Sequence, residues 1–224
     1  LKDASGVYSL RTADFDCDPY LLNCRNGTLN LQTGEFREHR AEDFLSLTSG
    51  VSYDANARCP RWERFMEEIM RSADEAATTE KVKYLQKAFG YALTGNTRYE
   101  CLFILYGATT RNGKGTAMET FLRLMGDYGK TARPETIGAR FQPNGNAPSE
   151  DVARLNGARF VNISEPDKKL TLSAALVKSL TGNDTITARY LHENSFEYRP
   201  QFKMFINTNY LPQITDLTLF SSGR

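Results

Sequence analysis

The sequence lacks the features that would tie it to a membrane, a disulfide framework or a metal cluster. No apolar run in its 224 residues approaches the length that spans a bilayer, and no secretory signal opens the chain, so we expect no membrane partner. It has only two histidines and no Cys-x-x-Cys pair. The four cysteines are widely spaced, which argues against a zinc site and favours reduced thiols in a cytosolic compartment. They are Cys17, Cys24, Cys59 and Cys101.

A strong excess of one charge is also absent. Lys and Arg number 28 against 27 Asp and Glu, a net charge of +1 that excludes a strongly basic, histone-like binder but leaves room for local basic patches. The length suits one large domain, or one with a smaller appendage, and 40% apolar residues can build its core. Because the chain starts at Leu1 and ends at Arg224 without a closing element, we expect a fragment of a longer polypeptide.

Three regions are predicted along the chain. Residues 1–60 read as short strands and turns, with an Asn26-Gly27 turn between two apolar stretches that predicts a hairpin. Residues 61–96 read as helical, with one helix opened by Pro60 and a second over 79–93. Their apolar stripes are predicted to be core: Trp62, Phe65, Met66 and Ile69 in the first helix, and Val82, Leu85, Phe89 and Leu93 in the second.

Residues 97–224 carry an α/β pattern. Strands are predicted at 101–106, 130–133, 158–163 and 201–207, helices at 115–125 and 172–180, and a hairpin within 185–199. Strands that alternate with helices indicate a parallel sheet with right-handed crossovers. Ligands of such sheets bind beyond the carboxyl ends of the strands, so polar residues at those ends are the first site candidates.

The strongest candidate follows the strand 101–106. A strand, a glycine-bearing loop, a lysine and a helix make a phosphate-binding loop. Backbone N–H groups and the helix N-terminus favour an anionic phosphate there, and Lys114 adds a positive charge. The residues expected to hold a nucleotide are Gly107, Thr110, Asn112, Gly113, Lys114, Gly115 and Thr116.

This loop departs from the commonest pattern. Five residues rather than four separate Gly107 from Gly113, and Gly115 follows the lysine, so Thr116 comes one position later than the hydroxyl that usually holds magnesium. An ordinary strand, turn and helix with a surface lysine is the alternative interpretation. Strand, loop and helix follow one another in the order that a phosphate-binding loop requires, which argues against this alternative.

Two further polar residues follow predicted strands. Glu165 comes after the strand 158–163, where a carboxylate can orient magnesium through water or polarise the attacking water. Asn209 follows the strand 201–207, where a neutral amide can hold that water or touch the γ-phosphate. The alternatives are a solvated glutamate before Pro166 and an asparagine in a turn before Pro212. The phosphate loop upstream favours the catalytic interpretation of Glu165; in isolation, the turn is the better interpretation of Asn209.

A basic and aromatic segment lies between these two positions. It combines positive charge with an aromatic face, the two ingredients of contact with single-stranded nucleic acid. A charged, solvated hairpin is an equally good interpretation. The candidate contacts are Lys178, Arg189, Tyr190 and His192.

The order of these motifs resembles that of the superfamily 3 helicases, and most of all the phage and plasmid primase-helicases related to the poxvirus primase-helicase. The motifs are the Asn-Gly-Lys loop, a strand ending in Ser-Glu, Lys-x-Leu-Thr-Gly-x-Asp with a later arginine, and a strand followed by Thr-Asn-x-x-Pro. Upstream, Leu22–Gly34, Cys59-Pro-x-Trp62 and Gly90–Gly95 are similar to the region before the helicase core of that family. The resemblance spans roughly residue 20 to the end.

The resemblance implies an AAA+-like P-loop core with a central parallel sheet, assembled as a homo-hexamer with ATP and Mg²⁺ between subunits and single-stranded DNA in the pore. Lys114 would bind phosphate, Thr116 would hold magnesium, Glu165 would be the acid of the second nucleotide motif and Asn209 the γ-phosphate sensor. The hairpin within 185–199 would enter the pore, and Arg224 stands where the family carries an arginine that reaches the neighbour's ATP.

We therefore expect an ATP-hydrolysing DNA helicase domain of a phage, prophage or plasmid replication protein in the bacterial cytoplasm. One alternative is a nucleotide-switched DNA-binding or origin-loading module, which would bind DNA and hydrolyse ATP without displacing a strand. Another is a small-molecule kinase, which would transfer phosphate to a nucleoside rather than to water.

Overall fold

The central element is a four-stranded parallel sheet in the order β4-β10-β6-β5, which confirms the predicted α/β class. The computed structural model describes residues 14–139, 150–164 and 170–214, so Glu165 and Arg224 lie outside the described residues. The strands are β4 (Phe103–Tyr106), β5 (Gly129–Ala132), β6 (Phe160–Ser164) and β10 (Lys203–Thr208).

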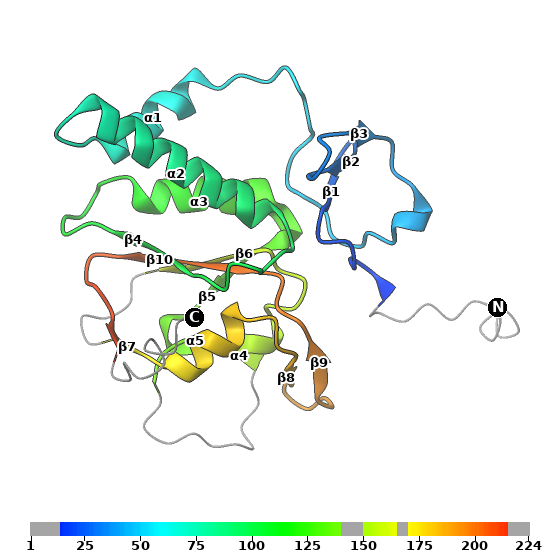
Figure 1. The fold of residues 1–224 in the computed structure, drawn as a ribbon. Helices are drawn as coiled ribbons and strands as arrows, with labels where there is room; N and C mark the ends of the chain where they lie inside the picture. The colour runs from blue at the N-terminus through cyan, green and yellow to red at the C-terminus, as the bar shows by residue number, and fades with distance from the viewer. Residues whose placement is uncertain (1–13, 140–149, 165–169, 215–224) are drawn as a thin grey trace, which may run out of the picture.

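Helices cover both faces of this sheet (Figure 1). One face carries α1 (Pro60–Met70), α2 (Glu75–Leu93) and α3 (Lys114–Met125), and the other carries α4 (Glu150–Ala153) and α5 (Ala174–Thr181). The central strands β6 and β10 are therefore buried on both faces, as their apolar sequences require, whereas Ile104 and Tyr106 of the edge strand β4 stay exposed.

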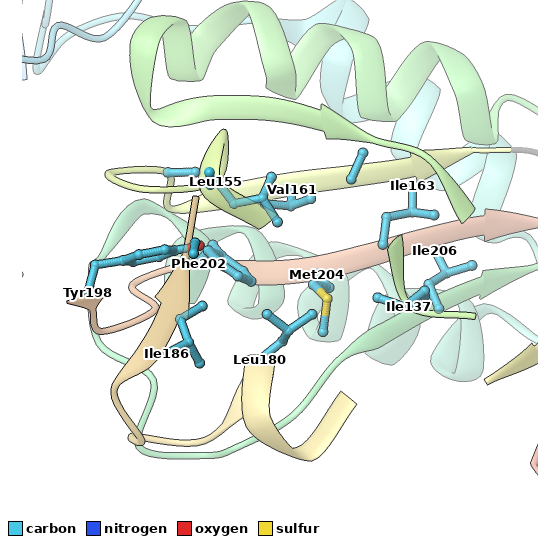
Figure 2. Close-up of a cluster of buried hydrophobic side chains, with 14 of the residues drawn as sticks. Ile137, Leu155, Val161, Ile163, Leu180, Ile186, Tyr198, Phe202, Met204 and Ile206 are labelled. Atoms are coloured by element: carbon cyan, nitrogen blue, oxygen red, sulfur yellow. The ribbon is translucent and has the colours of Figure 1, made fainter. Parts of the chain in front are cut away.

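Side chains alternate between two cores along each central strand. In β10, Met204 and Ile206 face the α5 side, where they pack with Leu180 and Val161 (Figure 2). Phe205, between them, faces the α2 side and stacks on Phe103 at 4.6 Å between ring centroids. Both cores position the carboxyl ends of the strands, because they fix β10 between β4 and β6.

The N-terminal sheet is small and antiparallel, and it confirms the predicted hairpin. It consists of β1 (Leu21–Cys24), β2 (Gly27–Asn30) and β3 (Phe36–Arg37). The turn occupies Arg25 and Asn26, and Gly27 already pairs with Cys24. A Cβ atom on Gly27 would lie 2.4 Å from the carbonyl oxygen of Arg37, so only glycine permits the close approach of β3.

Two buried cations attach the N-terminal sheet and α2 to the amino ends of the central strands. Arg159 is fully buried and donates to the carbonyls of Leu93 (3.0 Å), Asp18 (3.3 Å) and Leu21 (2.9 Å). Lys203 is also buried, and its ammonium donates to three other backbone carbonyls. Its acceptors are Thr94, Asn96 (3.2 Å) and Gln201 (3.0 Å).

Each guanidinium or ammonium also lies over an aromatic ring, Arg159 over Tyr128 at 4.5 Å and Lys203 over Tyr91 at 4.9 Å. Burial lowers the pKa of both side chains, and for Lys203 the charge of Arg159 adds to that effect. Carbonyl dipoles and ring faces, rather than carboxylates, therefore hold these two charges.

Several helices and strands begin at other residues than predicted. The second helix begins at Glu75 rather than 79, because the Asp74 side chain accepts from the backbone N–H of Ala77 at 2.6 Å and caps it there. The strand predicted from 101 begins at Phe103, and Cys101 before it is half-buried. The helix predicted over 172–180 begins at Ala174, because Thr171–Leu172 forms a strand.

Short elements complete the described fold. The hairpin predicted within 185–199 is confirmed as antiparallel β8 and β9. No helix of the described residues is long and apolar enough to cross a membrane. The elements are β7 (Thr171–Leu172) with β11 (Gln213–Ile214), β8 (Ile186–Ala188) with β9 (Phe196–Tyr198), and the 3-10 helices Ala41–Asp43, Gly126–Tyr128 and Pro134–Thr136.

All three predicted regions contribute residues to the core on the α2 side. The cluster on the α2 side contains Leu22 of the N-terminal sheet, Met66 of α1 and Phe160 of β6. Their proposed borders, 1–60, 61–96 and 97–224, stay a prediction.

Candidate functional site

Lys114 is the centre of the candidate site. Its Nζ donates to Asn209 Oδ1 at 2.9 Å and to Asn112 Oδ1 at 2.8 Å. It also reaches the carbonyl oxygens of Gly107 at 3.2 Å and Thr109 at 3.5 Å. The structure thus brings together a lysine and an asparagine that lie 95 residues apart in the sequence and that were both predicted as site residues.

The loop between β4 and α3 is held in a narrow curve around this ammonium. Gly113 has φ +83°, and a Cβ atom there would lie 2.4 Å from Ile69 Cγ2 of α1. Asn112 donates from Nδ2 to the carbonyl of Thr109 at 2.8 Å while its Oδ1 accepts from Lys114. Gly113 and Asn112 therefore fix the path of the loop, one through its free backbone and the other through its amide.

The start of α3 presents free donors beside Lys114. Gly113 is the N-cap residue and supplies no side-chain bond, and the first backbone bond of the helix runs from Ala117 N to Gly113 O at 3.0 Å. The backbone N–H groups of Lys114, Gly115 and Thr116 thus belong to the first turn, where no intrahelical carbonyl is available. An α-helix of 12 residues with such an N-terminus favours an anion.

The carboxyl ends of the neighbouring strands meet at this loop. Gly107 N donates to Thr208 O at 3.2 Å, which ties the loop to the end of β10. On the other side of β10, Asn207 pairs with Ser164, the last residue of β6. Glu165 follows Ser164 directly in the sequence and lies outside the described residues.

The positive charge at this edge has no carboxylate partner among the described residues. The oxygens bonded to Lys114 belong to two amides and two backbone carbonyls. Burial lowers the pKa of the Lys114 ammonium below its ordinary value. A partly desolvated cation with only neutral acceptors, beside a free helix N-terminus, is an arrangement that attracts a phosphate.

A cleft of about 770 Å³ opens beside the loop. Residues of α1, α2 and β4 line it, together with Gly107, Asn112 and Lys114. Tyr84 and Tyr106 line it with side chains that are more than half exposed. Its size falls in the range of small-molecule sites, so it can take the larger part of a nucleotide whose phosphates reach Lys114.

The other predicted nucleotide ligands lie on or next to this loop. Thr110 is exposed within it, and Gly115 and Thr116 are exposed in the first turn of α3. No cluster of three or more His, Cys, Asp or Glu in the described part of the chain could hold a metal ion. The magnesium roles of Thr116 and Glu165 stay predictions.

The predicted DNA contacts gather around the β8–β9 hairpin, except Lys178, which is exposed on α5. Tyr190 is half-buried, stacks on Phe196 at 5.6 Å and donates from its hydroxyl to the carbonyl of Ala153 at 3.0 Å. The ring of Tyr190 therefore anchors the hairpin on one side, which leaves less of it for stacking on a base.

The exposed part of the hairpin is its connecting segment. His192 is exposed there with φ +64°, and Arg189 is half-buried at the end of β8. Leu191, next to His192, exposes 54% of its surface and was not predicted as a contact. No sequence pattern separates this leucine from a core residue, because its exposure depends on the turn.

Sequence reasoning also missed Asn207. It is half-buried and is the second-to-last residue of β10, and its Nδ2 lies 3.9 Å from where a Cβ of Gly115 would stand. The period of the strand could have found it, because residues just before the end of a central parallel strand face the same edge.

The chain matches two sequence families. Residues 105–219 match the family described as "Family of unknown function (DUF5906)", and residues 1–71 match "D5 N terminal like". The first match spans the β4–α3 loop, β6, the β8–β9 hairpin and β10. The second spans the N-terminal sheet and α1.

Curated relatives of the chain are viral proteins. The chain is 27% identical to "Putative helicase L207/L206" of Acanthamoeba polyphaga mimivirus over 90% of this chain and 20% of that protein. It is 31% identical to "Putative helicase 022R" of Frog virus 3 (isolate Goorha) over 59% of this chain and 14% of that protein. The chain thus spans about a fifth or less of the length of these relatives.

Among solved structures, the apo NrS-1 C-terminal region (305–718) is similar with a TM-score of 0.49 and 13% identity, over 74% of this chain and 36% of that one.

Proposed function

This chain belongs to the family described as "Family of unknown function (DUF5906)", and we propose that it is the ATP-hydrolysing core of a helicase in a viral, phage or plasmid replication protein. The observation that carries this proposal is the bond between Lys114 and Asn209 at the carboxyl edge of the sheet. The names of the viral relatives support the helicase activity, and the free helix N-terminus supports phosphate as the ligand.

The described residues suggest how ATP would sit. Lys114 exchanges its amide acceptors for oxygens of the β- and γ-phosphates, while backbone N–H groups of the first turn of α3 bind the same phosphates. Asn209, already within hydrogen-bond distance of Lys114, then lies where it can sense whether the γ-phosphate is present. The nucleoside occupies the cleft beside β4.

Magnesium fits the oxygen-rich chemistry of this edge. The exposed hydroxyl of Thr116, two residues after Lys114, and the carboxylate expected from Glu165 are oxygen donors of the kind that Mg²⁺ prefers. When bound, the ion would neutralise charge on the phosphates. In the proposed reaction Glu165 orients the attacking water, and Arg224 of a neighbouring subunit stabilises the transferred phosphate in a homo-hexamer.

Single-stranded DNA is the proposed polymer substrate. The β8–β9 hairpin offers Lys178, Arg189 and His192 as contacts to phosphates and bases, with Tyr190 holding the hairpin in place. Movement of this hairpin with nucleotide state would draw the strand through the ring.

The test is ATP hydrolysis with and without single-stranded DNA, followed by strand displacement. Lys114→Ala is expected to abolish hydrolysis, whereas Lys87→Ala, an exposed lysine on α2, is expected to leave it unchanged. DNA-stimulated hydrolysis that survives Lys114→Ala would refute the proposal. Hydrolysis and DNA binding without strand displacement would favour a nucleotide-switched loading module instead.

A further inference from the structure

The second half of α1 packs directly against the β4–α3 loop. A Cβ atom on Gly113 would lie 2.4 Å from Ile69 Cγ2 and 3.2 Å from Phe65 Cε2. Because a Cβ atom stands only about 1.5 Å from its Cα atom, the Ile69 methyl group is in van der Waals contact with the Gly113 backbone. Figure 1 shows the end of α1 and the β4–α3 loop at the same end of the molecule.

Gly113 is the residue whose conformation this contact restrains. It has φ +83°, which glycine adopts at no steric cost, but glycine also populates other conformations freely. Its neighbours Asn112 and Lys114 are hydrogen-bonded to each other at 2.8 Å. Since Gly113 is also the N-cap residue of α3, its backbone sets the position of the Lys114 ammonium and the direction of the first N–H groups of the helix.

The side chains of α1 that meet the loop belong to a packed cluster. Met66 is 4% exposed in the core on the α2 side, and Trp62, Phe65 and Ile69 pack against that core as partly buried residues. The rings of Trp62 and Phe65 lie 5.6 Å apart between centroids. Packing and the branched Cβ of Ile69 leave these side chains little rotational freedom, so they can hold a flexible neighbour in place.

Ile69 faces the candidate site as well as the core. It lines the cleft of about 770 Å³ that Asn112 and Lys114 also line. The contact with Gly113 joins the two family matches, because α1 ends at Met70 within the match of residues 1–71 and the loop lies within the match of residues 105–219. The N-terminal region therefore reaches the candidate site through α1.

We propose that Ile69, supported by Phe65, is a positioning residue of the ATP site, which holds the β4–α3 loop in its phosphate-binding conformation before ATP arrives. The inference rests on the proposed function, because that function assigns the loop to ATP. A loop that is already ordered loses less conformational entropy when it closes on phosphate. Ile69 thus raises the affinity for phosphate through the order of the loop and forms no bond to the ligand's phosphates.

The experiment compares three variants of the 224-residue chain. Ile69→Ala removes the Cγ2 methyl group that faces Gly113, whereas Ile69→Val keeps it. Val82→Ala is the control for lost packing, because Val82 is half-buried in α2 against the same core and does not line the cleft.

Two measurements are made on each variant. The Ala117 amide donates to the carbonyl of Gly113 at 3.0 Å, so its hydrogen exchange without nucleotide, followed by NMR, reports the order of the loop. Titration calorimetry gives the dissociation constants of ATP and of inorganic tripolyphosphate, a probe that has no nucleoside.

Ile69→Ala is expected to speed exchange of the Ala117 amide about tenfold and to weaken ATP and tripolyphosphate alike, by about fivefold to tenfold. Ile69→Val is expected to restore wild-type exchange and both affinities. Val82→Ala is expected to lower the melting temperature about as much as Ile69→Ala but to leave exchange and both affinities unchanged.

Three outcomes would overturn the proposal. These are unchanged Ala117 exchange in Ile69→Ala, an equal effect of Val82→Ala, and a loss of affinity for ATP but not for tripolyphosphate, which would make Ile69 a contact of the nucleoside. Failure of the proposed function is distinguishable, because a wild-type chain that binds neither ligand refutes the ATP site. The exchange of the Ala117 amide then still decides whether Ile69 holds the loop.

Discussion

Replacing Asn209 by aspartate places a carboxylate where the structure has a neutral amide oxygen 2.9 Å from Lys114 Nζ. The variant is nearly isosteric, so the loop and β10 keep their shape. It changes the charge at the carboxyl edge by one unit and gives the ammonium the anionic partner that it lacks among the described residues. We expect this one change to have opposite effects on folding stability and on ATP affinity.

The magnitudes follow from the geometry. Opposite unit charges about 4 Å apart attract by about 4 kcal/mol at an effective dielectric constant of about 20. Because Lys114 is half-buried and solvent reaches this edge, the net gain in the free energy of unfolding is about 1 kcal/mol. The same carboxylate repels a phosphate that approaches Lys114, and a loss of about 1.4 to 2.8 kcal/mol lowers ATP affinity about tenfold to a hundredfold.

Urea denaturation measures the first effect and isothermal titration with ATP the second. Asn156→Asp, in an exposed turn after α4, adds the same charge far from the loop and controls for net charge. Asn209→Leu removes the acceptor without adding charge, and should lose stability while keeping more ATP affinity than the aspartate variant. Unchanged ATP affinity in Asn209→Asp would refute the assignment of phosphate to Lys114.

Three further predictions test the loop, the buried cations and the N-terminal ion pair. Gly113→Ala should abolish ATP binding, because the new Cβ atom would clash with Ile69 of α1. Gly34 has a similar positive φ but open space around it, so Gly34→Ala should lower the free energy of unfolding by only about 1 to 2 kcal/mol in urea denaturation and leave ATP binding intact. Arg159→Met should leave three buried carbonyls without a donor and lower the free energy of unfolding by about 3 kcal/mol. The melting temperature should then fall by about 6 to 12 °C, and an unchanged melting temperature would contradict this prediction. The hydrogen bonds from Arg37 lower the pKa of Asp43 below 3.8. Above that pH, the free energy of unfolding of the wild type should exceed that of Asp43→Asn by about 1 kcal/mol, and the difference should vanish as the pH falls through the lowered pKa. A difference in unfolding free energy that persists in acid would contradict this prediction.

Local patterns predicted the central sheet and the position of the candidate site. Alternating strands and helices predict the parallel topology, and the carboxyl-end rule predicts that Asn209 lies near Lys114, where the structure has a 2.9 Å contact. The rule works because the hydrogen-bonding register of parallel strands brings all their carboxyl ends to one edge. It could not distinguish Asn209 from a turn asparagine, which requires the actual distance.

Other features depend on long-range packing and had no local signal. The sequence shows Lys203 as a cation at the start of a strand, and nothing local indicates that it is buried against the carbonyls of 94, 96 and 201. The pairing of Asn23 with Thr28 follows from the hairpin, but the small pocket that these two residues line also needs the later segment with His39 and Thr48. Tyr190 was predicted as a DNA contact from its residue type alone, whereas its hydroxyl is bonded to Ala153.

Lys203 and Asn209 stand at opposite ends of β10 and connect the strand to different parts of the molecule. Lys203 begins the strand and donates to the carbonyl of Thr94, which caps the end of α2. Asn209 follows the last residue of the strand and accepts from Lys114, at the start of α3. Six residues of extended chain span about 20 Å, and their buried neighbours leave the strand little freedom to bend. Because the strand bends little, a displacement of a fraction of an ångström at one end of β10 also moves the other end. The amino and carboxyl edges of the sheet can therefore be coupled without a hinge.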